Sequence, residues 1–394
     1  MAKLVEITGK ALSGEWGTDD ETGDGIPILR TTNFTNEGVV DYKDVVTRTI
    51  TKKNIDEKYL RSGDIIIEKS GGSDKQPVGR VIYFDGPEKT YLFNNFTGLL
   101  RVKNQEAWFP KYVFYSLYGN YRRGGTRPFE NKTTGLHNLK TDDYVSRYEV
   151  AETDYKKQVE VCEHLDRLYN VIKLREEEIQ KLDDLIKARF VELFGEPILN
   201  PKEWKIVTIG DIALDVRYGT SRPAVEGGKY PYLRMNNLTI DGHLDLTDLK
   251  YIDIPEEELE KCVVRKGDIL FNRTNSLELV GKTAVFDLCE DMVIAGYIIR
   301  VRLNNKMILP EIFSQYMNHK TLKKILRGMA KGAVNQANIN AKELQSIKIY
   351  VPNMKLQDEF VTFVNQVHKS KVEIQQALEK TQLLFDSLMQ QYFG

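Results

Sequence analysis

The chain has 394 residues, of which 41% are hydrophobic and 29% charged, and its formal net charge is −1. This length suffices for two ordinary domains, and this composition excludes intrinsically disordered and membrane proteins. Residues 1–10 lack the apolar core of a secretory signal, and no apolar run approaches the ~18 residues of a membrane span. The three cysteines are far apart and the five histidines are scattered. We therefore expect no metal site, no disulfide and a cytoplasmic location.

The first 152 residues contain short β-like runs separated by Gly, Asn and Asp clusters. The runs span residues 64–67, 79–84 and 99–102. A helix is expected to begin at Pro110, because proline suits the first turn of a helix. This order of elements predicts a mixed α/β (α+β) module dominated by a curved sheet.

Residues 153–196 carry an apolar heptad repeat. Its positions are Leu165, Ile172, Ile179, Ile186 and Leu193. The repeat predicts a long helix that pairs with another helix, although Arg175 and Arg189 also fall on its seam. At ~1.5 Å per residue such a helix is about 55 Å long. The helix is expected to end at Phe194-Gly195, since glycine commonly follows the last turn.

Within residues 197–353, similar β-like runs predict strands at 268–271, 282–286 and 298–301. A helix is again expected to begin at a proline, Pro310. A second heptad repeat follows in 354–394 and again ends in Phe-Gly. Its positions are Phe360, Val367, Ile374, Thr381 and Leu388, with Phe363, Ala377 and Leu384 beside them.

The two halves of the chain repeat one another. Leu29-Arg30 and Asn33 recur 204 residues later as Leu233-Arg234 and Asn237, and Gly63-Asp64 recurs as Gly267-Asp268. The displacement then falls slowly to 199 at the two Phe-Gly ends, as small loop deletions between two copies of one fold would produce. We therefore expect module 1 (1–152), a long helix (153–196), module 2 (197–353) and a second long helix (354–394). The two helices should form an antiparallel coiled coil, giving a pseudo-two-fold symmetric molecule.

Lysine and arginine are concentrated in two segments, although the net charge of the whole chain is close to zero. Residues 111–147 contain seven Lys/Arg and three Asp/Glu, and residues 316–348 contain seven Lys/Arg and one Glu. Local basic patches, more than net charge, set the attraction for a polyanion. A charge run is also the ordinary composition of a solvated face, so this signal is weak by itself.

Residues that suggest catalysis do not form a repeated site. Val280-Gly281-Lys282-Thr283 resembles the end of a phosphate-binding loop, but Ser276 stands where its first glycine is needed. Asp64 with Glu68-Lys69 resembles a nuclease metal site, but the spacing is wrong and module 2 has Asn272-Arg273 at the second position. Two large modules without shared reactive groups favour recognition over reaction.

Polar loop residues, in contrast, occupy equivalent positions in both modules while their identities differ. Arg, Lys, Asn and Gln read base edges, and Lys and Arg also bind phosphates. The sequence therefore predicts DNA contacts in both modules. The candidates are Arg30, Thr32, Asn33, Lys69, Ser70, Lys75, Arg127, Lys132, Thr133, His137, Arg222, Arg234, Asn236, Asn237, Arg273, Asn275, Lys331, Asn335, Gln336 and Asn338.

The whole chain resembles the specificity subunit of type I restriction-modification systems. The resemblance rests on the order module, helix, module, helix and on several short segments. These are Pro201-Lys202-Glu203-Trp204 with Val207–Ile212, Tyr232–Asn237, Lys266–Leu270, and Ile349-Tyr350-Val351-Pro352 with Gln357. Module 1 departs from the pattern, because it lacks the Pro-Xaa-Xaa-Trp opening and the closing prolines after Tyr148.

The resemblance implies a non-catalytic subunit whose two modules each read one half of an asymmetric, interrupted DNA site. The paired helices would set the gap and dock two methyltransferase subunits, through which two restriction/translocase subunits would join. S-adenosylmethionine, ATP and Mg²⁺ would then be bound by those partners and not by this chain. Two alternatives stay open: a stand-alone DNA-binding or scaffold protein with a paired-helix dimerisation rod, and an enzyme that carries its own recognition modules.

Overall fold

A computed structural model describes residues 1–133, 136–333 and 336–394. The chain divides into two units, unit 1 (1–176 and 376–394) and unit 2 (177–375). Each unit contains one module and one half of each long helix, so both long helices continue from one unit into the other. No helix in the described part of the chain is long and apolar enough to cross a membrane.

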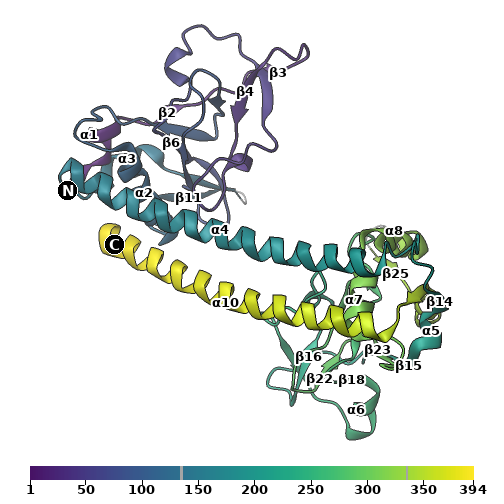
Figure 1. The fold of residues 1–394 in the computed structure, drawn as a ribbon. Coiled ribbons are helices and arrows are strands. Elements are labelled where there is room, and N and C mark those ends of the chain that lie inside the picture. Colours follow the sequence, from purple (N-terminus) through teal and green to yellow (C-terminus); the bar gives the residue numbers. More distant parts are fainter. Residues whose placement is uncertain (134–135, 334–335) are drawn as a thin grey trace. The chain divides into compact units, whose positions relative to one another are not determined.

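Unit 1 contains the elements of module 1 and two helix halves (Figure 1). Its helices are α1 (Leu4–Thr8), α2 (Pro110–Arg122), α3 (Thr141–Arg147) and the first half of α4 (Tyr155–Phe194). Short 3-10 turns occur at η1 (Thr31–Asn33), η2 (Asp56–Lys58) and η3 (Arg127–Phe129). Its strands are β1 (Ala2–Lys3), β2 (Leu12–Ser13), β3 (Thr18–Asp19), β4 (Ile26–Leu29), β5 (Val46–Thr49), β6 (Asp64–Glu68), β7 (Ser70–Gly72), β8 (Val81–Phe84), β9 (Leu92–Phe93), β10 (Thr97–Leu100), β11 (Glu130–Thr133), β12 (Leu136–Leu139) and β13 (Glu149–Val150).

Unit 2 repeats this plan. Its helices are α5 (Ile209–Ile212), α6 (Glu256–Cys262), α7 (Pro310–Asn318), α8 (Lys320–Met329), α9 (Ala341–Gln345) and the first half of α10 (Met354–Phe393), with a 3-10 turn at η4 (Met235–Asn237). Its strands are β14 (Lys205–Thr208), β15 (Ala213–Tyr218), β16 (Tyr230–Leu233), β17 (Lys250–Ile252), β18 (Val263–Val264), β19 (Ile269–Asn272), β20 (Thr274–Asn275), β21 (Thr283–Val285), β22 (Met292–Ile294), β23 (Ile298–Leu303), β24 (Lys331–Ala333), β25 (Gln336–Asn338) and β26 (Lys348–Val351).

Three sheets of each module correspond strand by strand, whereas the fourth, β3-β5-β4-β9 and β17-β16-β22-β18, shares only three of its four strands. The order β2-β10-β6-β8 in module 1 matches β15-β23-β19-β21 in module 2, and β11-β12-β7 matches the three strands β24-β25-β20. The first and last strands of each module also pair, β1 with β13 and β14 with β26. The β-runs and the two helices that begin at proline are thus confirmed, with ends shifted by one or two residues.

A buried glutamine joins the start of each long helix to its module in the same way. The Phe109 amide donates to Gln158 Oε1 at 2.8 Å, and the Leu309 amide donates to Gln357 Oε1 at 2.8 Å. Both glutamines are almost fully buried, at 1% and 0% exposure. A buried amide must satisfy its donors and acceptor, so this residue fixes the entry of the chain into α4 and into α10.

The two long helices run antiparallel in unit 2, where Phe190 and Phe194 of α4 pack on Phe360 of α10 with ring centroids 5.8 and 5.6 Å apart. Further along, Asp183 of α4 faces Lys371 of α10 at 2.5 Å. Figure 1 shows α4 in teal and α10 in yellow side by side here. The helix ends belong to the cores of the modules, since Ile186 and Val367 share one cluster with the strands of module 2.

In unit 1 the helix halves likewise join the module core. Leu165 and Ile172 of α4 share a cluster with Phe385, Met389 and Phe393 of α10 and with the module's strands. The predicted pairing of the helices is confirmed, but the second apolar row differs from the expected one. Leu384 is 50% exposed, whereas Phe385 is 3% exposed. After Phe360 and after Thr381 the buried side chain lies four residues on, at Val364 and Phe385, and not three.

The middle of the helix pair is more polar than the ends. Near the middle, Ile179 and Ile374 are only partly buried, whereas Leu165, Ile186 and Phe360 are buried. Leu193 and Leu388, close to the helix ends, are also only partly buried. Arg175 donates to the Ala377 carbonyl at 2.5 Å and to the Thr381 hydroxyl. Arg189 pairs with Glu359 at 2.6 Å. The two arginines that looked like defects in the heptads are therefore cross-helix hydrogen-bond donors.

Candidate nucleic-acid interface

A small three-stranded antiparallel sheet in each module gathers residues from two distant predicted loops. In module 1, β12 pairs with β11 and with β7. In module 2, β25 pairs with β24 and with β20. These pairings bring the segment that follows β6 next to the segment that precedes α3 in module 1. In module 2 they bring the segment that follows β19 next to the segment that precedes α9. The polar residues that the sequence assigned to two loops thus form one surface in each module.

In module 1 this sheet holds both paired and unpaired polar groups. Lys69 Nζ donates to Ser13 Oγ at 3.1 Å, and burial lowers the pKa of its ammonium group. His137 is buried, with Nδ1 3.0 Å from Glu130 Oε2 and Nε2 3.6 Å from Asp74 Oδ1. Ser70 is partly buried. Lys75 and Arg127 are exposed, and neither forms an ion pair with the described part of the chain. Among the candidate cations of module 1 whose side chains are described, these two are exposed.

In module 2 the corresponding residues are mostly engaged with neighbours. The Arg273 guanidinium lies 5.0 Å from the Tyr218 ring centroid. Asn275 Nδ2 donates to Asn272 Oδ1 at 2.9 Å, and Thr274 Oγ1 donates to Asn338 Oδ1 at 2.8 Å. Lys331 pairs with Glu343 at 2.6 Å but its side chain is 79% exposed. Gln336 is exposed at the edge of the sheet.

Arg30, Asn33 and their module 2 equivalents shape a loop. Asn33 is 1% exposed, and its Oδ1 accepts from the Arg30 amide at 2.9 Å while Nδ2 donates to the Asp41 carbonyl at 2.9 Å. Asn237 repeats both bonds at 2.8 Å with the Arg234 amide and the Asp245 carbonyl. A buried asparagine with both ends bonded holds the chain in place.

The charged head groups of this loop are also engaged. Arg30 Nη2 lies 3.4 Å from Asp44 Oδ2, and Arg234 Nη2 lies 2.8 Å from Asp248 Oδ2. Between these anchors Thr32 and Asn236 stand exposed at equivalent positions. Arg222 is exposed as well, but it binds Glu258 through Nε at 3.0 Å and Nη2 at 2.8 Å. Thr32 and Asn236 are thus the loop residues whose side chains face solvent.

Three predicted DNA contacts lie outside the described residues. Asn335 is not described at all, and of Lys132 and Thr133 only the backbone of β11 is described.

The carboxylates that suggested a nuclease site are structural. Asp64 accepts from Arg101 Nε at 2.7 Å and Nη2 at 2.6 Å, and its Oδ2 also accepts from the Arg61 amide at 2.8 Å. Asp268 binds Arg302 Nε at 3.1 Å and the Arg265 amide at 2.9 Å. Each Asp thus closes the turn before the central strand and neutralises a neighbouring arginine.

The Lys282 position likewise serves the fold. Lys282 Nζ donates to the Met235 and Leu238 carbonyls at 2.6 and 2.5 Å, and burial lowers the pKa of its ammonium group. In module 1, Arg80 takes this place and donates to the Thr31 and Phe34 carbonyls at 2.9 and 2.8 Å. A cation therefore holds the same loop in both modules, and Lys282 is not part of a phosphate-binding loop.

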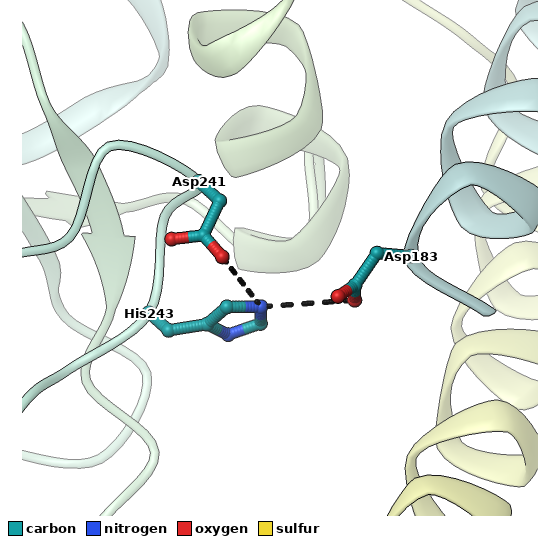
Figure 2. Close-up of side chains that lie close together, drawn as sticks. All are labelled: Asp183, Asp241 and His243. Carbon is teal, nitrogen blue, oxygen red and sulfur yellow. Dashed lines mark ion pairs between the residues drawn. The ribbon is translucent and has the colours of Figure 1, made fainter. Parts of the chain in front are cut away.

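A cleft of about 1070 Å³ lies in unit 2 between α4, α7, α10 and the loop 240–244. Figure 2 shows His243 pointing between Asp183 and Asp241. Its Nε2 is 3.9 Å from a carboxylate oxygen of each. Within 1–133, 136–333 and 336–394 this is the one trio of potential metal ligands whose atoms lie within 4.8 Å of one another. Because the Lys371 ammonium contacts the same Asp183 oxygen at 2.5 Å, we interpret the trio as a polar tether from the loop to α4.

The sequence reasoning missed helix α8 as an element. Its residues lie in the basic segment 316–348, but no helix was expected after the one that begins at Pro310. The available signal was the pair Leu322 and Leu326, four residues apart and flanked by lysines, which is the pattern of an amphipathic helix.

Comparisons with known proteins agree with this architecture. Residues 201–383 match the family model described as the type I restriction modification DNA specificity domain. The EcoKI specificity subunit of Escherichia coli K12 is 25% identical over 369 residues, covering 87% of this chain and 75% of that protein.

Two solved structures share the fold over the whole chain. A structure of a type I R-M system, concerned with its assembly and conformational transition, superposes with a TM-score of 0.57 at 19% identity and covers 100% of this chain and 96% of its own. The type I S subunit from M. genitalium superposes with a TM-score of 0.55 at 16% identity and covers 100% and 95%. The predicted fold class is thereby confirmed. By the specificity-domain match over residues 201–383, the similarity to a specificity subunit and the shared fold, the chain resembles the specificity subunits of type I restriction-modification systems.

Proposed function

We propose that each module reads one half of an asymmetric, interrupted DNA site, mostly from the major groove, and that the chain itself carries no active site. The observation that supports this proposal is the pair of equivalent three-stranded sheets, built on the same strands but carrying different polar residues. Side chains with amide and guanidinium groups discriminate base edges in the major groove. Modules with one scaffold and different surface residues are suited to reading different sequences.

The paired helices α4 and α10 would set the gap between the half-sites and dock two methyltransferase subunits. Each helix has 40 residues and is therefore ~60 Å long. That length is comparable with one to two DNA turns of ~34 Å, the unit in which half-site spacing is fixed. Two restriction/translocase subunits would join through the methyltransferases. S-adenosylmethionine, ATP and Mg²⁺ would be bound by these partners.

Phosphate contacts in module 1 are assigned to the exposed cations Lys75 and Arg127. Changing both to Ala should weaken binding to all duplex sequences, because phosphate contacts carry no sequence information. The slope of log K against log salt should fall in magnitude by about 0.9 for each lost contact. The measurement is fluorescence anisotropy of labelled duplex DNA with the full chain over a series of salt concentrations.

Lys53→Ala provides the matched control, since Lys53 is an exposed cation of module 1 outside the three-stranded sheet. Its salt slope should equal that of the wild type. A Lys75→Ala/Arg127→Ala variant that retained the wild-type slope would show that DNA phosphates do not contact these two residues beside the sheet.

A further inference from the structure

Helix α8 distinguishes module 2 from module 1. In module 1 the chain passes from α2 through the short turn η3 to β11, whereas in module 2 it passes from α7 through α8 to β24. Both paths end at the edge of the three-stranded sheet. Among the described elements, α8 is thus an addition to the shared plan, placed directly before a strand of the candidate recognition surface.

The two faces of α8 differ sharply. Leu322 and Leu326 are buried at 1% and 0% exposure and join the core of module 2. Lys320, Lys324 and Arg327 are exposed. Residues spaced by four and three lie on one side of a helix, so these three cations form a single stripe opposite the leucines.

Helix α8 is held against the loop 276–281, which leads from β20 to β21. Lys323 Nζ donates to the Gly281 carbonyl, and Arg327 Nη2 donates to the Glu278 carbonyl at 3.5 Å. The contact is close, because a Cβ on Gly281 would lie 2.7 Å from Leu326 Cδ1. The stripe therefore has a fixed position beside the sheet.

Protein carboxylates do not neutralise the stripe. No ion pair joins Lys320, Lys324 or Arg327 to an acidic group in the part of the chain that the structure describes. Beneath them burial, and after it the neighbouring Arg327 and Lys282, lower the pKa of Lys323 to about 7. An anion bound over the helix would favour the charged form of Lys323.

Two cations at the end of α2 in module 1 are used differently. Arg122, at the end of α2, pairs with Asp386 of α10 at 2.7 Å. Arg123 donates to the Phe393 carbonyl at the end of α10. These two cations of module 1 thus bind groups of α10, whereas Lys320, Lys324 and Arg327 of module 2 are exposed to solvent.

We propose that α8 binds the phosphates of duplex DNA through Lys320, Lys324 and Arg327, as a sequence-independent anchor on a helix that has no counterpart among the described elements of module 1. This inference rests on the proposed function. From Lys320 to Arg327 the helix rises by ~10 Å, close to three base-pair steps of ~3.4 Å. A stripe of this length beside the recognition sheet can reach the phosphates that flank the bases read by Gln336 and its neighbours.

The test is the salt dependence of binding by the full chain to a random-sequence pool of duplexes of about 40 base pairs, close to four DNA turns. In the variant Lys324→Gln/Arg327→Gln the slope of log K against log salt should fall in magnitude by about 1.8, which is 0.9 for each lost phosphate contact. The control Lys261→Gln/Lys266→Gln removes the same charge from exposed residues of module 2 in and after α6. Its slope should match the wild type.

Three outcomes would overturn the assignment to α8 while leaving the proposed function intact. They are a wild-type slope in the α8 variant, an equal fall in both double variants, and unchanged DNA binding with loss of the methyltransferase subunits in a pull-down. Absence of duplex binding by the wild-type chain would overturn the proposed function itself and this inference with it. Circular dichroism melting of each variant shows whether the fold is retained, and Lys320→Gln alone, with an expected fall of about 0.9, repeats the test at a third position.

Discussion

Replacing Phe360 with alanine should lower the free energy of unfolding of unit 2 by about 3–5 kcal/mol, the cost of removing a fully buried phenylalanine from a core. Phe360 is 0% exposed, and its ring meets those of Phe190 and Phe194 across the two helices. The same side chain lies in the cluster that includes the strands of module 2. Urea unfolding followed by circular dichroism would measure the change.

Val372→Ala is the matched control, because Val372 lies on the same helix and is 56% exposed. Its effect should stay within about 0.5 kcal/mol, as for most surface substitutions. If Phe360→Ala and Val372→Ala had the same effect, the helices would not be joined to the module through this aromatic cluster.

Exchanging module 2 for that of a relative should replace one half of the recognised DNA sequence and leave the other half unchanged. The structure suggests where to cut. Strands β14 and β26 pair with each other, and Trp204 Nε1 and Tyr350 Oη donate to the Phe194 and Gly195 carbonyls at 2.9 Å. Exchanging only residues 209–347 therefore retains the strand pair and its hydrogen bonds to the end of α4.

The effect of this exchange should be large, because specific DNA binding is typically 10³–10⁷ times tighter than non-specific binding. The methylated sequence in cells that express the hybrid chain with its partner subunits would show which half has changed. The gap between the halves should persist, since both long helices are kept. A hybrid that altered both halves would contradict independent reading.

The long helices could be predicted because their signals are local. Heptads without Pro or Gly, each ending at Phe-Gly, predict helices that the structure places at Tyr155–Phe194 and Met354–Phe393. The exact seam could not be predicted, because the choice between Leu384 and Phe385 depends on which one meets the core of the module. Packing of this kind involves residues far apart in the sequence.

The candidate site was harder to predict, because polar residues at equivalent loop positions occur both in the scaffold and on the proposed reading surface. Asn33 and Asn237 are identical in the two modules, and both are buried with equivalent hydrogen bonds. Thr32 and Asn236 differ between the modules, and both are exposed. Identity at equivalent positions thus accompanies a structural role here, and difference accompanies exposure. From the sequence alone, all four residues were equally good candidates for DNA contact.

The pairing of β7 with β12, and of β20 with β25, could also not be predicted from local sequence patterns. These strands are two to four residues long and lie more than 60 residues apart in the chain. Such short strands bury little and acquire their register from the sheet that they join. The sequence predicted the polar segments of each module, and the fold assembled them into one surface.

The most direct test of two independent reading modules is to map methylated bases in the genome of cells that express this chain with its methyltransferase subunits. The account predicts one asymmetric motif in two specified parts, separated by a gap of unspecified bases of constant length. A continuous motif, or two identical halves, would contradict it.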